Sequence, residues 1–112
     1  MTKLTALLPL LLIGPVLGTE PAADPAGTHR YLIERTFPAG ALDGLDATVK
    51  AKVNATNARY HVRWVMSYAN AERTKTYCIY EGPSPEAVKE AAVANKLPVD
   101  SITEVPVTLE PK

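Results

Sequence analysis

The feature that most constrains the fold is a pair of strand-like segments joined by a short polar link. The first is "YHVRWVMSYA", residues 60–69, and the second is "KTYCIYE", residues 75–81. Hydrophobic side chains alternate along the first segment at Val62, Trp64, Met66 and Tyr68. A period of two over so few residues is typical of β-strands, and the link "NAER" is short enough to keep the strands adjacent. The sequence therefore predicts an antiparallel hairpin.

Helical patterns lie on both sides of this hairpin. Residues 42–57 carry hydrophobic side chains at steps of three and four, which predicts an amphipathic helix. These side chains are Leu42, Leu45, Val49 and Val53. After the hairpin, Ser84 is expected to cap a second helix that begins at Pro85. Asn95 is expected to end that helix in a left-handed conformation.

One further strand is expected at each end of this unit. Residues 29–37, "HRYLIERTF", precede the first helix, and residues 101–110, "SITEVPVTLE", follow the second. Pro106 restricts the last strand to an edge of the sheet. The order strand, helix, strand, strand, helix, strand predicts one α+β domain over residues 29–112. Its fold would be a ferredoxin-like βαββαβ sandwich with an antiparallel sheet in the order 4-1-3-2.

The N-terminal region has the pattern of a targeting segment. Lys3 precedes an apolar run, and the small residues around Gly18 fit a cleavage site, so residues 1–18 are predicted to be a signal peptide. Residues 19–28, "TEPAADPAGT", are predicted to be a disordered lead-in. The mature protein is therefore expected in the periplasm or secreted, without a membrane attachment after cleavage.

Charge excludes some classes of partner. The chain has 12 basic and 12 acidic residues, and removal of Lys3 leaves 11 against 12, a net charge of −1. Because no basic stripe is present, nucleic acid is not an expected partner. Cys78 is the only cysteine, so it cannot close an intrachain disulfide.

The predicted sandwich would leave one face of its sheet uncovered. Both helices lie on one face, and the other face would draw its side chains from Leu32, Glu34, Val62, Trp64, Met66 and Tyr68. A patch of this composition is too apolar to remain in water. The sequence therefore predicts a homodimer in which two sheets stack face to face, with a small cavity between them.

Several motifs together resemble the DUF4242 family of small bacterial proteins over residues 30–105. The motifs are Ile33-Glu34-Arg35, Trp64 with Ser67-Tyr68, Tyr77-Cys78 before Tyr80, and Leu97-Pro98 before Ile102. The resemblance implies a ferredoxin-like fold that dimerises and binds nickel. The family often has a histidine between Trp-Val and Ser-Tyr, where this chain has Met66, and another after the helix glutamate, where Ala91 follows Glu90. Thioether and thiolate ligands suit softer ions than imidazole does.

Two groups of residues are candidate metal sites. The first is a sheet-face site made from Glu34, Met66, Tyr68 and Cys78, with Tyr80 as the alternative to Cys78. The sequence does not decide which face Cys78 occupies, and a core thiol is the alternative. The second is a rim site in which Glu81 would lie between His29 and His61; ordinary solvated histidines are the alternative there.

These observations lead to two functional hypotheses. The first is an exported protein that binds nickel or another transition metal at the sheet face of a homodimer. The alternative is a metal-free module of the same fold that binds a small ligand or a partner protein. No catalytic residues are predicted, because nothing resembles a nucleophile elbow or an oxyanion-hole loop.

Overall fold

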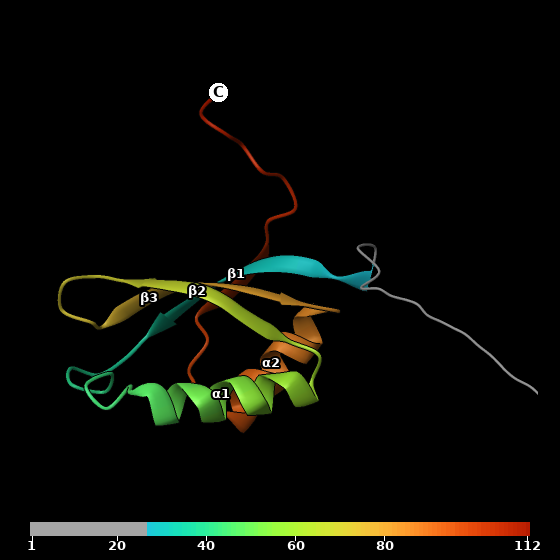
Figure 1. Cartoon of the computed structure of the whole chain (residues 1–112). Coiled ribbons are helices and arrows are strands. Elements are labelled where there is room, and N and C mark those ends of the chain that lie inside the picture. Colours follow the sequence, from blue (N-terminus) through green and yellow to red (C-terminus); the bar gives the residue numbers. More distant parts are fainter. Residues whose placement is uncertain (1–26) are drawn as a thin grey trace, which may run out of the picture.

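The computed structural model describes residues 27–112 (Figure 1). The predicted signal peptide, residues 1–18, and the predicted lead-in as far as residue 26 lie outside the described residues. The elements follow the predicted order: β1 (His29–Thr36), α1 (Ala47–Arg59), β2 (Arg63–Ala69), β3 (Lys75–Gly82), α2 (Pro85–Ala94) and β4 (Ser101–Glu104). Within this part of the chain, neither helix is long and apolar enough to cross a membrane.

The four strands form one antiparallel sheet with the order β2-β3-β1-β4. This is the predicted order read from the opposite edge. β1 pairs with β3 along its whole length, from His29 opposite Gly82 to Thr36 opposite Lys75. Both helices lie on one face of the sheet, as Figure 1 shows. The predicted ferredoxin-like α+β fold is confirmed, and the two helices leave the other face open.

A β-bulge at Val65 decides which face each β2 side chain occupies. Trp64 lies opposite Tyr80, and Met66 takes the next pairing position, so Val65 is an extra residue. Trp64 therefore shares the helix-covered face with Tyr80, whereas Met66 and Tyr68 lie on the open face. The expectation that Trp64 lies on the open face is wrong, because strict alternation does not continue through a bulge.

Val62 also lies in the core and not on the open face. It is 4% exposed and packs with the buried cluster. The residue before it, His61, has a φ of 61°, so the chain turns at this point and the alternation does not extend back to Val62. The predicted strand over residues 60–69 accordingly begins at Arg63.

Helix α1 begins at Ala47 and not at residue 42. The Asp46 side chain accepts a hydrogen bond of 2.9 Å from the backbone N–H of Val49 and caps the helix. Leu42 and Leu45, which were expected to lie on the helix, lie in a turn-rich loop before it. Asp46 has an extended backbone conformation, so the helix does not continue on its N-terminal side to Leu45 and Leu42.

Helix α2 begins as the sequence predicts. The Ser84 hydroxyl accepts a hydrogen bond of 3.1 Å from the backbone N–H of Ala87, and Pro85 is the first helical residue. The predicted left-handed stop is displaced by one residue. Asn95 has a right-handed φ of −85°, and Lys96 has a φ of 59°.

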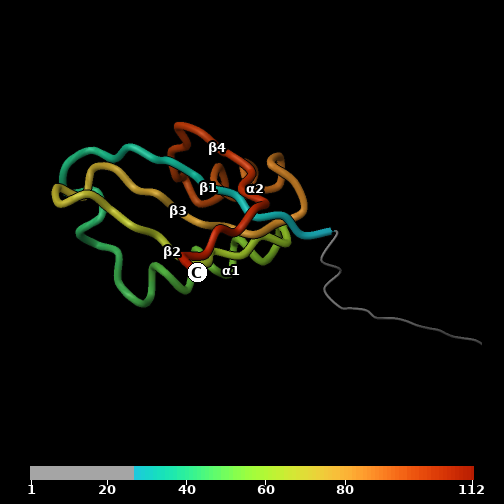
Figure 2. The backbone as a smooth tube through the Cα atoms, turned by 90° about the horizontal axis from the view of Figure 1, so that it is seen from above, coloured from blue at the N-terminus to red at the C-terminus, as the bar shows by residue number. Residues whose placement is uncertain are grey.

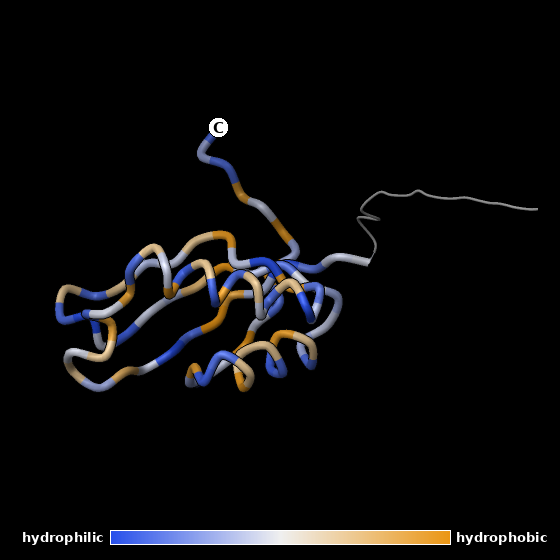
Figure 3. The backbone as a smooth tube through the Cα atoms, turned by 60° about the horizontal axis from the view of Figure 1, so that its bottom comes forward, coloured by the Kyte–Doolittle hydropathy of each residue, from blue (hydrophilic) through white to orange (hydrophobic). Residues whose placement is uncertain are grey.

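Strand β4 ends earlier than the predicted residue 110, at Glu104. The Val105 N–H still bonds to the Arg30 carbonyl at 2.9 Å, but Pro106 has no N–H to continue the ladder. The last residues therefore form a tail that stands off the sheet on the side away from the helices (Figures 1 and 2). Figure 3 shows hydrophobic positions along this tail, where Val107 is 71% exposed and Leu109 is 89% exposed.

The core lies between the sheet and the helices. Its buried members are Tyr31, Ile33, Val62, Cys78, Tyr80, Val88 and Ala91. The odd-numbered residues of β1 point into this core, and Ile33 is fully buried. Burying one aliphatic side chain of this size contributes about 1.5–3 kcal/mol. The even-numbered residues Leu32 and Glu34 consequently face the open side.

Candidate functional site

The open face of the sheet carries half-exposed hydrophobic side chains, which we call the open-face patch. Strand register assigns to it Leu32, Met66, Tyr68, Tyr77 and Ile79. Met66 is 50% exposed, Tyr68 64% and Tyr77 41%. Contiguous large apolar side chains on the surface of a monomer mark contact sites. This face is therefore a candidate for docking or ligand binding.

Glu34 supplies a carboxylate at the edge of this patch. It lies opposite Tyr77 of β3, and Tyr68 of β2 lies opposite the same tyrosine from the other side. The Lys75 Nζ atom is 3.6 Å from the Glu34 carboxylate and 3.2 Å from Asp100. Three of the four predicted metal ligands, Glu34, Met66 and Tyr68, are thus on one face.

The fourth predicted ligand, Cys78, is on the opposite face. Its side chain lies in the core at 5% exposure, and its Sγ atom is 3.5 Å from the Thr76 hydroxyl. The alternative ligand Tyr80 shares that buried face. Among residues 27–112, no three His, Cys, Asp or Glu side chains are grouped so that they could hold a metal ion. The four residues therefore do not converge within one chain.

Among the described residues, neither histidine of the predicted rim site pairs with Glu81. The Nδ1 atom of His29 is 2.8 Å from the Glu104 carboxylate. Glu81 instead accepts a hydrogen bond of 2.6 Å from Arg63, and His61 is exposed in its left-handed turn. Each carboxylate at this rim is engaged by a different cation or ring.

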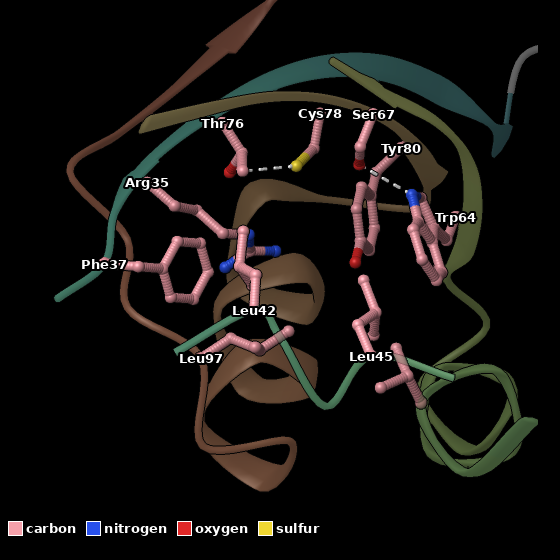
Figure 4. Close-up of a pocket in the computed structure, with 11 residues that line it drawn as sticks. Arg35, Phe37, Leu42, Leu45, Trp64, Ser67, Thr76, Cys78, Tyr80 and Leu97 are labelled. Atoms are coloured by element: carbon pink, nitrogen blue, oxygen red, sulfur yellow. Dashed lines mark hydrogen bonds between the residues drawn. The ribbon is translucent and has the colours of Figure 1, made fainter. Parts of the chain in front are cut away.

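A second candidate site, which we call the inner pocket, lies on the helix-covered face of the sheet (Figure 4). Its volume is about 80 Å³. The strands contribute Arg35, Trp64, Ser67, Thr76, Cys78 and Tyr80. Apolar residues of the loops and α1 complete it: Phe37, Leu42, Leu45, Val53 and Leu97. The open surface of the pocket is apolar, although several side chains behind it are polar.

Arg35 is the buried charge in this region, and only 2% of the residue is exposed. Its Nη1 atom donates a hydrogen bond of 2.7 Å to the Pro98 carbonyl, and the guanidinium carbon lies 5.5 Å from the centre of the Tyr80 ring. In the described part of the chain, no carboxylate lies within salt-bridge distance of it. The sequence signal for this burial is strand alternation. Arg35 is an odd-numbered residue of β1, as Tyr31 and Ile33 are, so it points to the same face of the sheet.

Two further polar side chains lie behind the inner pocket. Burial raises the pKa of the Tyr80 phenol, and the nearby Arg35 cation and Asn57 amide oppose that rise. Asn57 is 1% exposed, its Oδ1 atom accepts a hydrogen bond of 3.0 Å from Asn95, and its Nδ2 atom has no partner among the described residues. At neutral pH, Tyr80 is therefore a neutral donor beside a cation.

Comparison with known proteins gives a family and a fold. Residues 31–105 match the family described as "Nickel responsive protein SCO4226-like". The crystal structure of SCO4226 from Streptomyces coelicolor A3(2) is similar, with a TM-score of 0.61 and 23% sequence identity. The similarity covers 71% of this chain and 99% of that one. No curated protein gives a significant match.

Proposed function

Because this chain belongs to the family of nickel-responsive proteins similar to SCO4226, we propose that it is a homodimeric binding protein whose ligand lies between two stacked open faces. The observation that carries this proposal is the open-face patch around Glu34, where Met66, Tyr68 and Tyr77 are exposed by 41% to 64%. Sheets that pack face to face lie about 10 Å apart, which is the space that such side chains fill.

A two-fold symmetric dimer suits the open-face patch, because such a dimer buries the same surface of both copies. The patch side chains lie on β1, β2 and β3, so the centre of the sheet would be covered. Glu34 would then lie at the border of a largely apolar interface, where a carboxylate needs a cation as a partner. In a single chain, this cation is Lys75, whose Nζ atom lies 3.6 Å from the Glu34 carboxylate.

A transition metal, with nickel first, is the ligand that the family description favours. The described residues of one copy contain no cluster of three metal-ligating side chains, so a single copy does not supply a complete metal site. Two copies would bring together two sets of Glu34, Met66 and Tyr68 across the interface. A metal held there would bind to the dimer and not to the monomer.

The test combines oligomeric state with metal titration. We expect the mature protein to sediment as a dimer at micromolar concentration, and calorimetry with Ni(II), Zn(II) and Cu(I) to give heat that Glu34→Ala abolishes. Glu90→Ala, at an exposed position on α2, is the matched control and should bind as wild type does. Metal binding that is identical in Glu34→Ala would exclude this site, and a monomer would exclude the stacked dimer.

The placement of Cys78 favours a second candidate function. Because the only thiol faces the core, the same interface is also suited to a metal-free ligand or a partner protein. A dimer that gives no heat with any of the three metals would support this second function. We further propose that the chain acts in the periplasm or outside the cell. N-terminal sequencing of the exported protein tests this, and the expected first residue is Thr19.

A further inference from the structure

The C-terminal tail, residues 105–112, carries hydrophobic side chains with the alternation of a strand. Val105, Val107 and Leu109 occupy every second position, as the residues on one face of a strand do. Val107 is 71% exposed and Leu109 is 89% exposed, so the chain's own fold leaves both largely in water. Both lie beyond residue 105, where the match to the family ends. The similarity to the family therefore does not explain these two side chains.

Arg30 of β1 fixes the place where the tail leaves the sheet. Its carbonyl accepts a hydrogen bond of 2.9 Å from the Val105 N–H, and its Nη1 atom donates to the Val105 carbonyl at 3.2 Å and to the Thr108 hydroxyl at 3.3 Å. Pro106 and Pro111 restrict the backbone, which lowers the entropy that the tail would lose on docking. The tail is thus held on the open side of the sheet, away from the helices of its own chain (Figures 1 and 2).

A groove along the outer edge of β2, which we call the edge groove, is suited to such a segment. Within residues 27–112, β2 pairs with β3 on one side only, so its outer backbone groups have no strand to pair with. The groove has a volume of about 510 Å³, in the range of about 300–1,000 Å³ that is usual for binding sites. Leu45 and Val65, which are 37% and 38% exposed, are among its lining residues.

Charge on the tail complements charge in the edge groove. Lys50 and Arg73 both line the groove. The tail carries Glu110 directly after Leu109. Among the described residues, neither Lys50 nor Glu110 takes part in an ion pair. A tail that places Leu109 on the apolar part of the groove therefore brings a carboxylate to its basic rim.

A second copy stacked on the open face presents its edge groove within reach of the tail. β2 and β4 are the opposite edges of the sheet. A two-fold axis along the strands would place β2 of the second copy over β4, where the tail begins. An axis across the strands would place it over β2, above which the tail ends in Figure 2. Stacked sheets lie about 10 Å apart, whereas the eight residues 105–112 span up to about 26 Å when extended.

We propose that the C-terminal tail of each copy docks in the edge groove of the other, so that two exchanged tails hold the stacked dimer together. Val107 and Leu109 pack against Leu45 and Val65 of the second copy, and Glu110 pairs with a basic residue of the groove. This inference rests on the proposed homodimer and adds a second, separate contact to it, outside the open-face patch.

Disulfide formation between different chains tests where the tail lies. Leu109→Cys and Val65→Cys are made on separate chains, mixed and gently oxidised, and peptide mass spectrometry identifies the bridges. The native thiol of Cys78 is 5% exposed, so the introduced thiols are the accessible ones. We expect a bridge between positions 109 and 65. Val93→Cys, at a 76% exposed position on α2, is the matched control and should give little bridging to position 109.

Sedimentation of the wild type separates this inference from the proposed function. A dimer that gives no bridge between positions 109 and 65, or one that bridges position 93 equally, would overturn tail docking and leave the stacked dimer intact. A monomer would exclude both. A single chain with both Val65→Cys and Leu109→Cys should form a covalent dimer. A covalent monomer with an internal bridge would show that the tail docks on its own copy, against the proposal.

Two sets of variants test the contacts by affinity. Val107→Ser together with Leu109→Ser should raise the dissociation constant of the dimer about tenfold or more, because two apolar side chains of each copy are no longer buried. Val93→Ser is the matched control and should leave the constant unchanged. Lys50→Glu should weaken the dimer, and Glu110→Lys on the same chain should restore it. An unchanged constant in the double serine variant, or no restoration by Glu110→Lys, would refute the docking described here.

Discussion

Tyr68→Lys tests the proposed dimer at the most exposed of the large side chains Met66, Tyr68 and Tyr77 of the open-face patch. Tyr68 is 64% exposed on the open face and lies opposite Tyr77. The substitution removes the ring and places a charge in the interface of each copy. The fold itself should tolerate the change, because the side chain makes few contacts within its own chain.

The expected magnitude follows from the exposed area. With about 200 Å² for a tyrosine side chain, 64% exposure leaves about 130 Å² available for burial. At about 25 cal/mol per Å², this is about 3 kcal/mol for each copy as an upper estimate. If half of this is realised in each of two copies, the dimer weakens by about 3 kcal/mol, or about 100-fold in its dissociation constant.

Sedimentation equilibrium over a dilution series measures this constant. Val93→Lys is the control, because Val93 is 76% exposed and lies on α2, away from the open face. We expect the control to dimerise as wild type does, and thermal unfolding should be similar for the two variants. If Tyr68→Lys leaves the dissociation constant unchanged, or if Val93→Lys weakens the dimer equally, the open face is not the interface.

Three further predictions concern the fold. Ile33→Ala should lower the free energy of unfolding by about 2–5 kcal/mol in a denaturant titration, because the side chain is fully buried. The pKa of Asp100 is lowered, first by the hydrogen bond from the Thr36 hydroxyl, so its contribution to stability is present at neutral pH and is lost as pH falls through the lowered pKa. Asp100→Asn should therefore be less stable than wild type at neutral pH and equally stable in strong acid; a constant difference would contradict this. Deletion of the bulge residue Val65 should be tolerated better than deletion of the paired residue Ile79, as measured by urea midpoints, and an equal loss would show that the bulge is not dispensable.

Much of the fold followed from local signals in the sequence. The hairpin, the Ser84 cap and the order of elements were sufficient to predict the sheet order, because right-handed crossovers leave few alternatives. Helix α1 was harder to delimit. Leu42 and Leu45 continue its periodicity but belong to the preceding loop, and Asp46 is the residue that ends that loop. Periodicity alone does not distinguish a loop that packs against the core from another helical turn.

The candidate sites were less predictable because they depend on which way side chains face. The sequence left the face of Cys78 open, and the strand register places it in the core. Arginine on a strand is usually exposed, so the sequence does not mark Arg35 as a candidate site residue. Its burial depends on the packing of Tyr31 and Ile33 on the same strand face, and its isolation depends on residues far away in the sequence. Strand alternation indicates the face that Arg35 shares with Tyr31 and Ile33, but the lack of a nearby carboxylate among the described residues has no local signature.

The bulge at Val65 explains why one hairpin can serve two separate surfaces. In a regular strand, Trp64, Met66 and Tyr68 would all face the same side. The extra residue moves Trp64 to the helix-covered face, where it becomes a wall of the inner pocket, and leaves Met66 on the open face. An indole on the open face would have enlarged the patch but removed one wall of the pocket. A single inserted residue thus divides the apolar side chains of β2 between the open face of the sheet and the inner pocket.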